Sequence, residues 1–172
     1  MNKRYQELIQ IVPDFPEKGI LFRDITPLLN DASAFRQVID DMSNPFCNKQ
    51  VDAVVAIEAR GYIFGAPIAL ELRTRFVPVR KEGKLPRQTT KVEYSLEYGS
   101  ATIEMHQDAL QSHQRVLIVD DVLATGGTLE ATISLVEQSG AETVGIVVLA
   151  ELLQLKGRQR INREDVVSLL EF

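Results

Sequence analysis

The sequence predicts a single α/β domain in which a central, mostly parallel sheet is flanked by helices. Short β-branched apolar runs alternate along the chain with longer segments of helical periodicity, the pattern of parallel strands joined by crossover helices. The 172 residues suffice for one domain with a core, and no internal repeat or low-complexity stretch divides them. Such sheets bind ligands at the carboxyl ends of their strands, so polar residues that follow a strand are the first candidates for a site.

The N-terminal third predicts two helices on either side of an irregular segment. Residues 3–12 place four apolar side chains on one helical face. Residues 13–29 are rich in Pro and Gly, yet several of their apolar side chains need burial: Phe15, Ile20, Leu21, Phe22 and Ile25. Asp31 or Ser33 is expected to cap a helix that runs to about Phe46.

The middle of the chain predicts two strands, a helix and a polar loop. Residues 51–57 are expected to form a buried parallel strand, followed by an apolar helix to about Leu72, with Pro67 near its start or at a kink. Residues 75–79 predict a second strand. Residues 80–92 are polar and basic, and a stretch of this kind inside a compact domain is usually functional or mobile.

The C-terminal half predicts further strands and helices. Residues 93–99 and 100–106 indicate two strands around a turn at Gly99 and Ser100. Residues 115–119 and 142–150 read as buried strands on either side of a helix that ends at Gly140. A short helix over 152–160 and a last strand over 166–172 complete the domain.

Composition narrows the class of protein. A net charge of -5 and a pI of about 5.1 argue against a nucleic-acid-binding surface. The single cysteine, Cys47, excludes an intrachain disulfide framework and a cysteine metal cluster. The N-terminus lacks the apolar run of a secretion signal, and the longest apolar runs are far too short to cross a membrane. We therefore expect a cytoplasmic protein without nucleic-acid or membrane partners.

The stretch "VLIVDDVLATGGTL" at residues 116–129 carries the clearest chemistry. We interpret it as a buried strand that ends on Asp120 and Asp121, followed by a Thr-Gly-Gly-Thr turn into a helix. Carboxylates accept hydrogen bonds from the paired hydroxyls of a sugar. Glycines let backbone N–H groups approach an anion, and a helix N-terminus favours phosphate. The whole string therefore indicates a site for a ribose 5-phosphate.

An ordinary strand-to-helix turn is the alternative interpretation of this stretch. In that case an aspartate caps the helix and the glycines only relieve crowding, which is the better reading of an isolated "TGG". Two other phosphate-binding motifs are absent from the sequence, G-x-x-x-x-G-K-[ST] and G-x-G-x-x-G. The turn also has no lysine, so it is not a nucleoside-triphosphate loop.

The string resembles the phosphoribosyl-pyrophosphate (PRPP) motif of type I phosphoribosyltransferases, and five further segments resemble the adenine phosphoribosyltransferases. They are "PDFPEKGILFRDITPLL" (13–29), "IEARGYIFG" (57–65), "VRKEGKLP" (79–86), "YSLEYG" (94–99) and "ELLQLKGR" (151–158). These matches cover nearly the whole chain in the family's order. The resemblance implies one phosphoribosyltransferase domain over 1–172, with a small base-binding hood at 1–30 and a mobile catalytic loop at 80–98.

The resemblance also implies roles for the residues that match the motifs. Asp120 and Asp121 would bind the ribose hydroxyls. The 5-phosphate would lie in the loop of Ala124, Thr125, Gly126, Gly127 and Thr128. The pyrophosphate would meet Glu58, Ala59, Arg60, Arg80, Lys81 and Lys84. Family members often carry a non-proline cis peptide in the loop around Arg60, and Mg²⁺ would be bound through PRPP without a direct protein ligand.

Base recognition and proton transfer are implied in the same way. The adenine pocket would be lined by Leu21, Phe22 and Arg23, with Phe22 stacked on the base and the backbone of Leu21 reading its edge. Glu97 would be the catalytic residue that transfers a proton at the base. The segment around it departs from the family at Glu82, where a basic or neutral residue is common, and at Arg87, where glycine often follows "KLP".

The implied reaction is purine salvage: adenine and PRPP give AMP and pyrophosphate. Cations stabilise the leaving pyrophosphate, a carboxylate serves the proton transfer, and a closed loop keeps water from the cation-like sugar. Two alternatives stay open, namely an enzyme for xanthine or hypoxanthine and a non-catalytic PRPP-sensing regulator on the same fold. The acidic pI and the length argue against the regulator, which generally carries an added DNA-binding domain. The family also suggests a homodimer.

Overall fold

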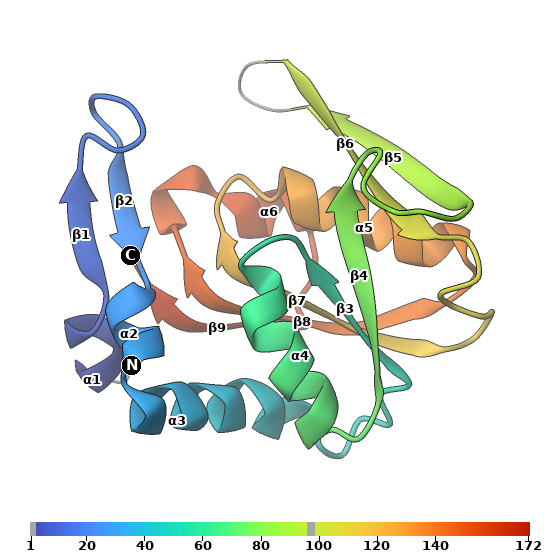
Figure 1. The fold of residues 1–172 in the computed structure, drawn as a ribbon, viewed down its shortest axis with the longest axis horizontal. Helices are drawn as coiled ribbons and strands as arrows, with labels where there is room; N and C mark the ends of the chain where they lie inside the picture. The colour runs from blue at the N-terminus through green and yellow to red at the C-terminus, as the bar shows by residue number, and fades with distance from the viewer. Residues whose placement is uncertain (1–2, 96–98) are drawn as a thin grey trace.

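A seven-stranded sheet forms the centre of the computed structural model, which describes residues 3–95 and 99–172 (Figure 1). The strand order is β5-β6-β4-β3-β7-β8-β9. The strands are β3 (Ala53–Ile57), β4 (Arg75–Lys81), β5 (Thr89–Ser95), β6 (Ser100–His106), β7 (Arg115–Leu123), β8 (Glu142–Glu151) and β9 (Val166–Glu171). The five strands from β4 to β9 pair in parallel, while β6 is antiparallel to both β4 and β5. This confirms the predicted α/β domain with a mostly parallel sheet.

Helices cover both faces of the sheet, which explains the uninterrupted apolar runs in its central strands. Alternate residues of β3 belong to different cores: Val55 packs with α5 (Gly127–Gln138), and Val54 packs with α3 (Ala32–Ser43) and α4 (Gly61–Glu71). A strand that is buried on both faces must be apolar throughout. Asp31 caps α3 by accepting a hydrogen bond from the Ala34 amide at 2.9 Å, as predicted.

The N-terminal segment differs from its prediction as a single helix over 3–12. Only α1 (Lys3–Glu7) is helical, and β1 (Gln10–Pro13) pairs with β2 (Leu21–Asp24) in a separate antiparallel sheet. Three β-branched residues at 9, 11 and 12 favour the extended backbone over a helix. The segment predicted as irregular thus contains β2 and also α2 (Thr26–Asn30), which has Pro27 in its first turn.

Several apolar residues of this hairpin are exposed, contrary to the expectation that they need burial. Ile25 is buried and Phe22 is half-buried, whereas the side chains near the tip of the hairpin are exposed: Phe15, Ile20 and Leu21. Exposed apolar groups beside a half-buried aromatic ring form a surface that an apolar or aromatic ligand would cover. The hairpin is therefore more open than a packed segment.

The predicted polar loop at 80–92 is shorter in the structure. Strand β4 continues through Lys81 and β5 begins at Thr89, so residues 82–88 alone connect them. The buried carboxylate of Glu104 on β6 fixes this connection by accepting hydrogen bonds from the amides of Lys84 and Leu85, both at 2.9 Å. Pairing with β6 therefore makes part of this segment a strand, although its polar composition predicted a loop.

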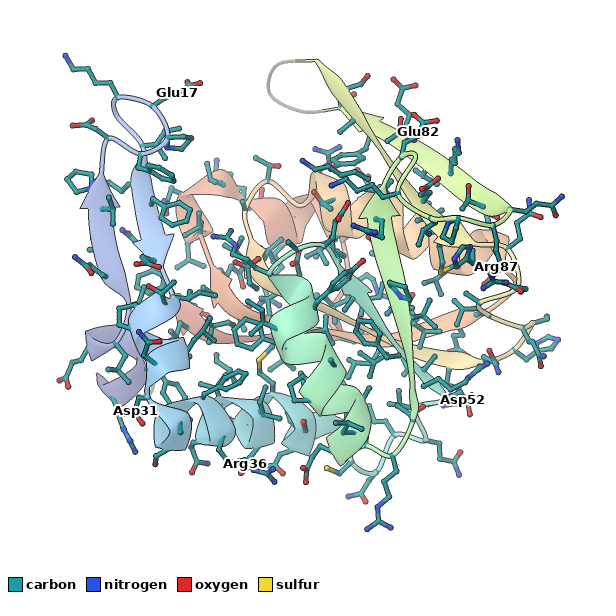
Figure 2. All side chains as sticks on the ribbon, viewed as in Figure 1. Glu17, Asp31, Arg36, Asp52, Glu82 and Arg87 are labelled. Atoms are coloured by element: carbon teal, nitrogen blue, oxygen red, sulfur yellow. The ribbon has the colours of Figure 1, made fainter. Side chains whose placement is uncertain are left out.

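The two departures from the family pattern lie on the outside of this region (Figure 2). Glu82 accepts a hydrogen bond from Lys91 at 2.7 Å, and Arg87 forms an ion pair with Asp108. All four side chains are largely exposed. Both residues thus have surface partners and do not reach the carboxyl ends of the central strands.

The remaining short elements close the C-terminal side of the fold. They are η1 (Asn44–Phe46), η2 (Leu153–Leu155) and α6 (Gly157–Ile161). Pro67 lies inside α4 and not at its start. Among the described residues, no helix has the length and apolar character needed to cross a membrane.

Candidate functional site

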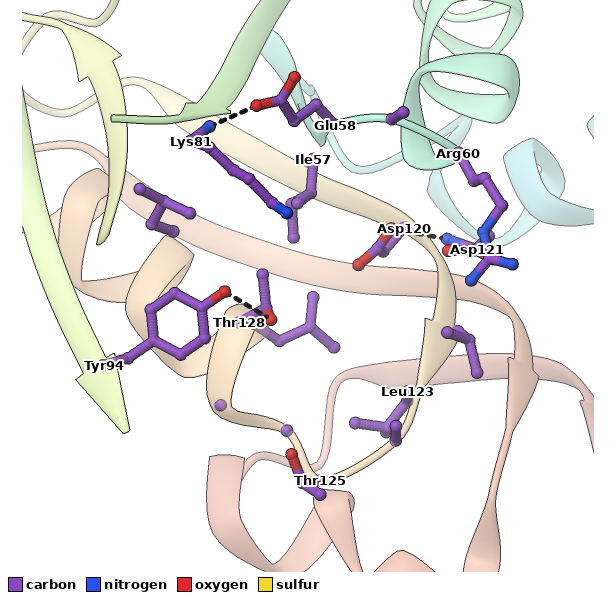
Figure 3. A pocket seen from close by; sticks show the side chains of 17 residues that line it. Ile57, Glu58, Arg60, Lys81, Tyr94, Asp120, Asp121, Leu123, Thr125 and Thr128 are labelled. Atoms are coloured by element: carbon purple, nitrogen blue, oxygen red, sulfur yellow. Dashed lines mark hydrogen bonds and ion pairs between the residues drawn. The ribbon is translucent and has the colours of Figure 1, made fainter. Parts of the chain in front are cut away.

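A cavity of about 380 Å³ opens at the carboxyl ends of β3 and β7 (Figure 3). These neighbouring parallel strands bring together the "EARG" segment after β3 and the Asp-Asp pair of β7. The cavity is lined by Ile57, Glu58, Ala59, Arg60, Lys81, Tyr94, Ile103 and all residues from Asp120 to Leu129. The sequence-based expectation of a ligand site at this edge of the sheet agrees with the position of this cavity.

The two aspartates lie within β7 and not at its end. The strand continues to Leu123, and β8 pairs with it through Asp120, Val122 and Leu123. The prediction that the strand stops on the acids was therefore wrong. This pairing holds the backbone of both acids in place, and the Asp120 carboxylate projects into the cavity (Figure 3).

Burial makes both aspartates costly to ionise. Burial, followed by the charge of Asp121, raises the pKa of Asp120 well above its usual range. Burial likewise raises the pKa of Asp121, although Arg60 opposes the shift with its Nε atom 2.8 Å from the Asp121 carboxylate. A ligand that donates hydrogen bonds to these oxygens would relieve the cost of their ionisation.

The segment from Ala124 to Thr128, called the phosphate loop below, leads directly into α5. Gly126 has φ 82°, a left-handed conformation that favours glycine, and it gives α5 no side-chain cap. The first amides of this 12-residue helix therefore face the cavity without a capping side chain. Uncapped amides at a helix N-terminus form a favourable place for an anion.

Glu58 forms hydrogen bonds and ion pairs with the basic residues on the other side of the cavity. Its carboxylate accepts hydrogen bonds from Arg80 Nε at 3.2 Å and from the Lys81 amide at 2.5 Å, and Lys84 Nζ lies 3.6 Å away. Burial alone would raise the pKa of Glu58, but the Lys81 amide and Arg80 lower it overall. The Lys81 side chain extends into the cavity (Figure 3). The side chains of Arg80 and Lys84 are instead paired with Glu58. The Glu58–Ala59 peptide is cis.

The hairpin residues predicted to bind a base do not line this cavity, but Arg60 connects them to it. The guanidinium carbon of Arg60 lies 5.3 Å from the centre of the Phe22 ring, while its Nε atom pairs with Asp121. Arg23 stacks on the ring of Phe172 at 4.8 Å. Its Nε and Nη1 atoms are buried, and neither finds a hydrogen-bond partner within the described part of the chain.

Comparisons with known proteins decide the family. Residues 29–170 match the model of the phosphoribosyl transferase domain. An adenine phosphoribosyltransferase of Lachnoclostridium phytofermentans is 48% identical, over 99% of this chain and 98% of its own. One of Myxococcus xanthus is 56% identical, over 94% of this chain and 88% of its own. The chain belongs to the adenine phosphoribosyltransferase family.

Solved structures of adenine phosphoribosyltransferases agree with this assignment. That of Thermoanaerobacter pseudethanolicus has a TM-score of 0.96 and 48% identity, and the match covers 99% of each chain. That of Saccharomyces cerevisiae has a TM-score of 0.92 and 38% identity, and the match covers 98% of this chain and 97% of the other. The yeast protein is complexed with adenine and an imino-altritol bisphosphate. These matches confirm the predicted fold and enzyme class.

Two kinds of residue stand apart from the predicted adenine phosphoribosyltransferase site. Glu97, the predicted catalytic residue, lies outside the described residues together with its two neighbours. Tyr94 and Ile103 line the cavity but were missed, and Tyr94 accepts a hydrogen bond from Thr128 at 3.3 Å. Alternation along β5 could have indicated Tyr94, because Val92 and Tyr94 share the face that packs on the core.

Proposed function

We propose that this chain transfers the 5-phosphoribosyl group from PRPP to adenine, with PRPP in the cavity and adenine against the β1–β2 hairpin. The observation that carries the proposal is the placement of the Asp-Asp pair and the uncapped start of α5 in one cavity. Sugar hydroxyls donate to the two carboxylates, and the 5-phosphate accepts from the amides of the phosphate loop. The bisphosphate and adenine in the yeast relative support this arrangement.

The leaving pyrophosphate is assigned to the opposite side of the cavity. Lys81 already faces this space, and Arg60 borders it beside Asp121. Arg80 and Lys84 reach the pyrophosphate after exchanging the carboxylate of Glu58 for its oxygens. Cations placed where negative charge develops lower the barrier for departure of the leaving group.

Mg²⁺ is assigned to the substrate and not to a ready-made protein site. Residues 3–95 and 99–172 hold no group of three or more His, Cys, Asp or Glu side chains that could bind a metal. Mg²⁺ commonly binds through substrate phosphates and retained waters, so the pyrophosphate of PRPP would carry the ion into the cavity. When bound, the ion would neutralise charge on the pyrophosphate.

Three hairpin residues are assigned to the base. Phe22 is half-buried and offers a ring face, with the exposed Leu21 beside it. The backbone of Leu21 is assigned to the edge of the base, on the resemblance of "GILFRD" to the family. The buried, unpaired Nε and Nη1 atoms of Arg23 suit the ring nitrogen acceptors of a purine.

Glu97 is assigned to proton transfer at the base, on the resemblance of "YSLEYG" to the family. Residues 80–98 are proposed to move as a loop that covers the site and keeps water from the cation-like sugar. Tyr94 brings the described end of this segment to the phosphate loop, since Thr128 donates a hydrogen bond to it. The segment thus already touches the site that it would cover.

We further propose a cytoplasmic homodimer that uses the outer face of α4. Leu70 on α4 is 81% exposed, and Phe76 on the following strand is 37% exposed. Large apolar side chains that remain exposed on a folded chain favour a protein partner. Light scattering on the purified protein tests this assembly, and a mass near 19.3 kDa for the particle would contradict it.

An assay of base preference tests the proposed reaction. Purified protein is mixed with Mg²⁺, PRPP and either adenine, hypoxanthine, guanine or xanthine, and nucleotide formation is followed. We expect AMP from adenine and far slower product from the other three bases. Absence of AMP, or faster turnover of hypoxanthine or xanthine, would contradict the proposal.

A further inference from the structure

The phosphate loop is supported from behind by the start of α6. A Cβ atom on Gly157 would lie 2.2 Å from the carbonyl oxygen of Ala124 and 2.9 Å from the amide nitrogen of Gly126. A Cβ atom on Gly126 would lie 2.7 Å from the carbonyl oxygen of Gly157. Two backbone segments packed this closely leave no slack, so a displacement of Gly157 also displaces the loop.

The residue after Gly157 is held by a buried carboxylate. Glu151, the last residue of β8, accepts hydrogen bonds from Arg158 Nε at 3.1 Å and from Ser168 Oγ at 2.6 Å. Arg158 also donates from Nη1 to the carbonyl oxygen of Val166 at 2.9 Å. These contacts join the start of α6 to β8 and β9, the two strands at that edge of the sheet.

Glu151 and Arg158 form an ion pair in which the carboxylate is far more buried than the guanidinium. The Glu151 side chain is 5% exposed and that of Arg158 is 38% exposed. The hydrogen bond from Arg158 lowers the pKa of Glu151, against the opposing effect of burial, so the carboxylate is charged at neutral pH. Removal of the arginine would leave a buried charge with one hydroxyl partner, and the surrounding backbone would shift to solvate it.

We propose that Glu151, Arg158 and Ser168 are positioning residues that hold Gly157 behind the phosphate loop and thereby set its affinity for the 5-phosphate. This inference rests on the proposed function of the loop. None of the three side chains lines the cavity, so they act through the backbone at Gly157 and not by contact with the substrate. Their loss should therefore affect ligands that carry the phosphate and spare those that lack it.

Arg158→Met tests the inference, with Arg163→Met as a matched control. Arg163 follows α6, is 28% exposed, pairs with Asp165 at 2.6 Å and donates to the carbonyl oxygen of Thr143 at 2.7 Å. Both contacts lie away from the phosphate loop. Dissociation constants of AMP and adenine are measured by calorimetric titration, below the melting temperature of each variant.

The expected result is a selective loss of AMP affinity. Arg158→Met should weaken AMP binding about tenfold and change adenine binding by less than about twofold, because a small misplacement of binding groups has large effects. Arg158→Lys keeps the charge without the planar fork and should recover part of the loss. Arg163→Met should change neither constant.

Other outcomes separate this inference from the proposed function. If wild-type protein does not bind AMP, the proposed function fails. If it does, and Arg158→Met binds AMP equally well or loses AMP and adenine affinity in parallel, the positioning role is overturned. Should Arg158→Met fail to fold, Ser168→Ala decides: it removes one hydrogen bond from Glu151 and should give a smaller, equally selective loss. Unchanged AMP binding in Ser168→Ala would then overturn the inference.

Discussion

Two sets of carboxylates in this molecule differ in which groups donate hydrogen bonds to them. Glu58, Glu104 and Glu151 accept hydrogen bonds from amides, arginines or hydroxyls of the protein, and the pKa of each is lowered. Asp120 is half-buried, the neighbouring Asp121 is buried and paired with Arg60, and the pKa of each is raised. The glutamates find their hydrogen-bond donors within the folded chain. The ionised form of the aspartates stays unfavourable until a ligand donates hydrogen bonds to them. Under the proposed function, Asp120 and Asp121 bind the ligand, Glu58 holds the cations of the pyrophosphate side, and Glu104 and Glu151 support the surrounding backbone.

Replacement of Glu97, which belongs to neither set and is the proposed proton-transfer residue, should give the largest effect. We expect Glu97→Ala to lower turnover by roughly 10²- to 10⁴-fold, the usual contribution of a general acid or base, with little change in PRPP affinity or stability. Steady-state kinetics and PRPP titration measure this. Glu93→Ala, four residues earlier in the sequence, is the matched control. Unchanged turnover in Glu97→Ala would remove the proton-transfer assignment.

Truncation of a supporting carboxylate should reduce stability more than binding. Glu104→Ala leaves the amides of Lys84 and Leu85 and the Thr89 hydroxyl without their acceptor. We expect it to lower the free energy of unfolding by about 2–4 kcal/mol, the cost of several unsatisfied buried donors. Urea titration followed by circular dichroism measures the loss. An unfolding midpoint equal to that of the wild type would show that these hydrogen bonds do not hold the connection.

The two sets of carboxylates should be protonated at different pH values as the solution is acidified. The lowered pKa values of Glu58, Glu104 and Glu151 mean that their stabilisation is complete above their unfolded-state pKa values and is lost as pH falls through the folded-state values. Asp120 and Asp121 have raised folded-state values, so they protonate first as pH falls, and their protonation favours the folded state. PRPP binding should therefore weaken at a higher pH than unfolding.

Titration of PRPP over a pH series, beside circular dichroism, measures this separation. The phosphates of PRPP also titrate, near pH 6 for a typical phosphate ester. Asp120→Asn is the control, because in this variant the ligand phosphates and Asp121 still titrate and Asp120 does not. A larger pH dependence is expected in the wild type than in Asp120→Asn. Equal dependence in the two proteins would remove the titration of Asp120 from the explanation.

The smallest effect is expected at the exposed pairs that depart from the family pattern. Arg87→Gln breaks the ion pair with Asp108, in which both side chains are more than half exposed. Such pairs contribute little because water and salt screen them. Thermal unfolding and turnover should match the wild type. A clear loss of turnover would mean that this surface takes part in the reaction.

Long apolar patterns made much of this fold predictable from the sequence. Strands β3, β7 and β8 were recognisable as continuous apolar runs that are buried on both faces, and helix α3 by its helical period. Strand β1 was not recognised, and β5 was expected at 93–99 although it spans Thr89–Ser95, since both are edge strands with mixed polarity.

Parts of the candidate site that are continuous in sequence could be predicted, whereas contacts between distant segments could not. The Asp-Asp pair and the phosphate loop are continuous in sequence, so one motif contains them. The pairing of Arg80 with Glu58 spans 22 residues, and the contact of Gly157 with Gly126 joins two separate elements. Contacts of that kind depend on how the elements pack, which no local pattern contains.

The most direct test of the two sets compares Asp120→Asn with Glu104→Gln, two replacements of the same chemical kind. Unfolding free energy and PRPP dissociation constant are measured for both variants at neutral pH. Asp120→Asn should weaken PRPP binding about tenfold, by loss of a charge-assisted hydrogen bond, while its stability stays equal or rises. Glu104→Gln should lose stability and keep most of its PRPP affinity. Lower stability with unchanged PRPP affinity in Asp120→Asn would contradict the account.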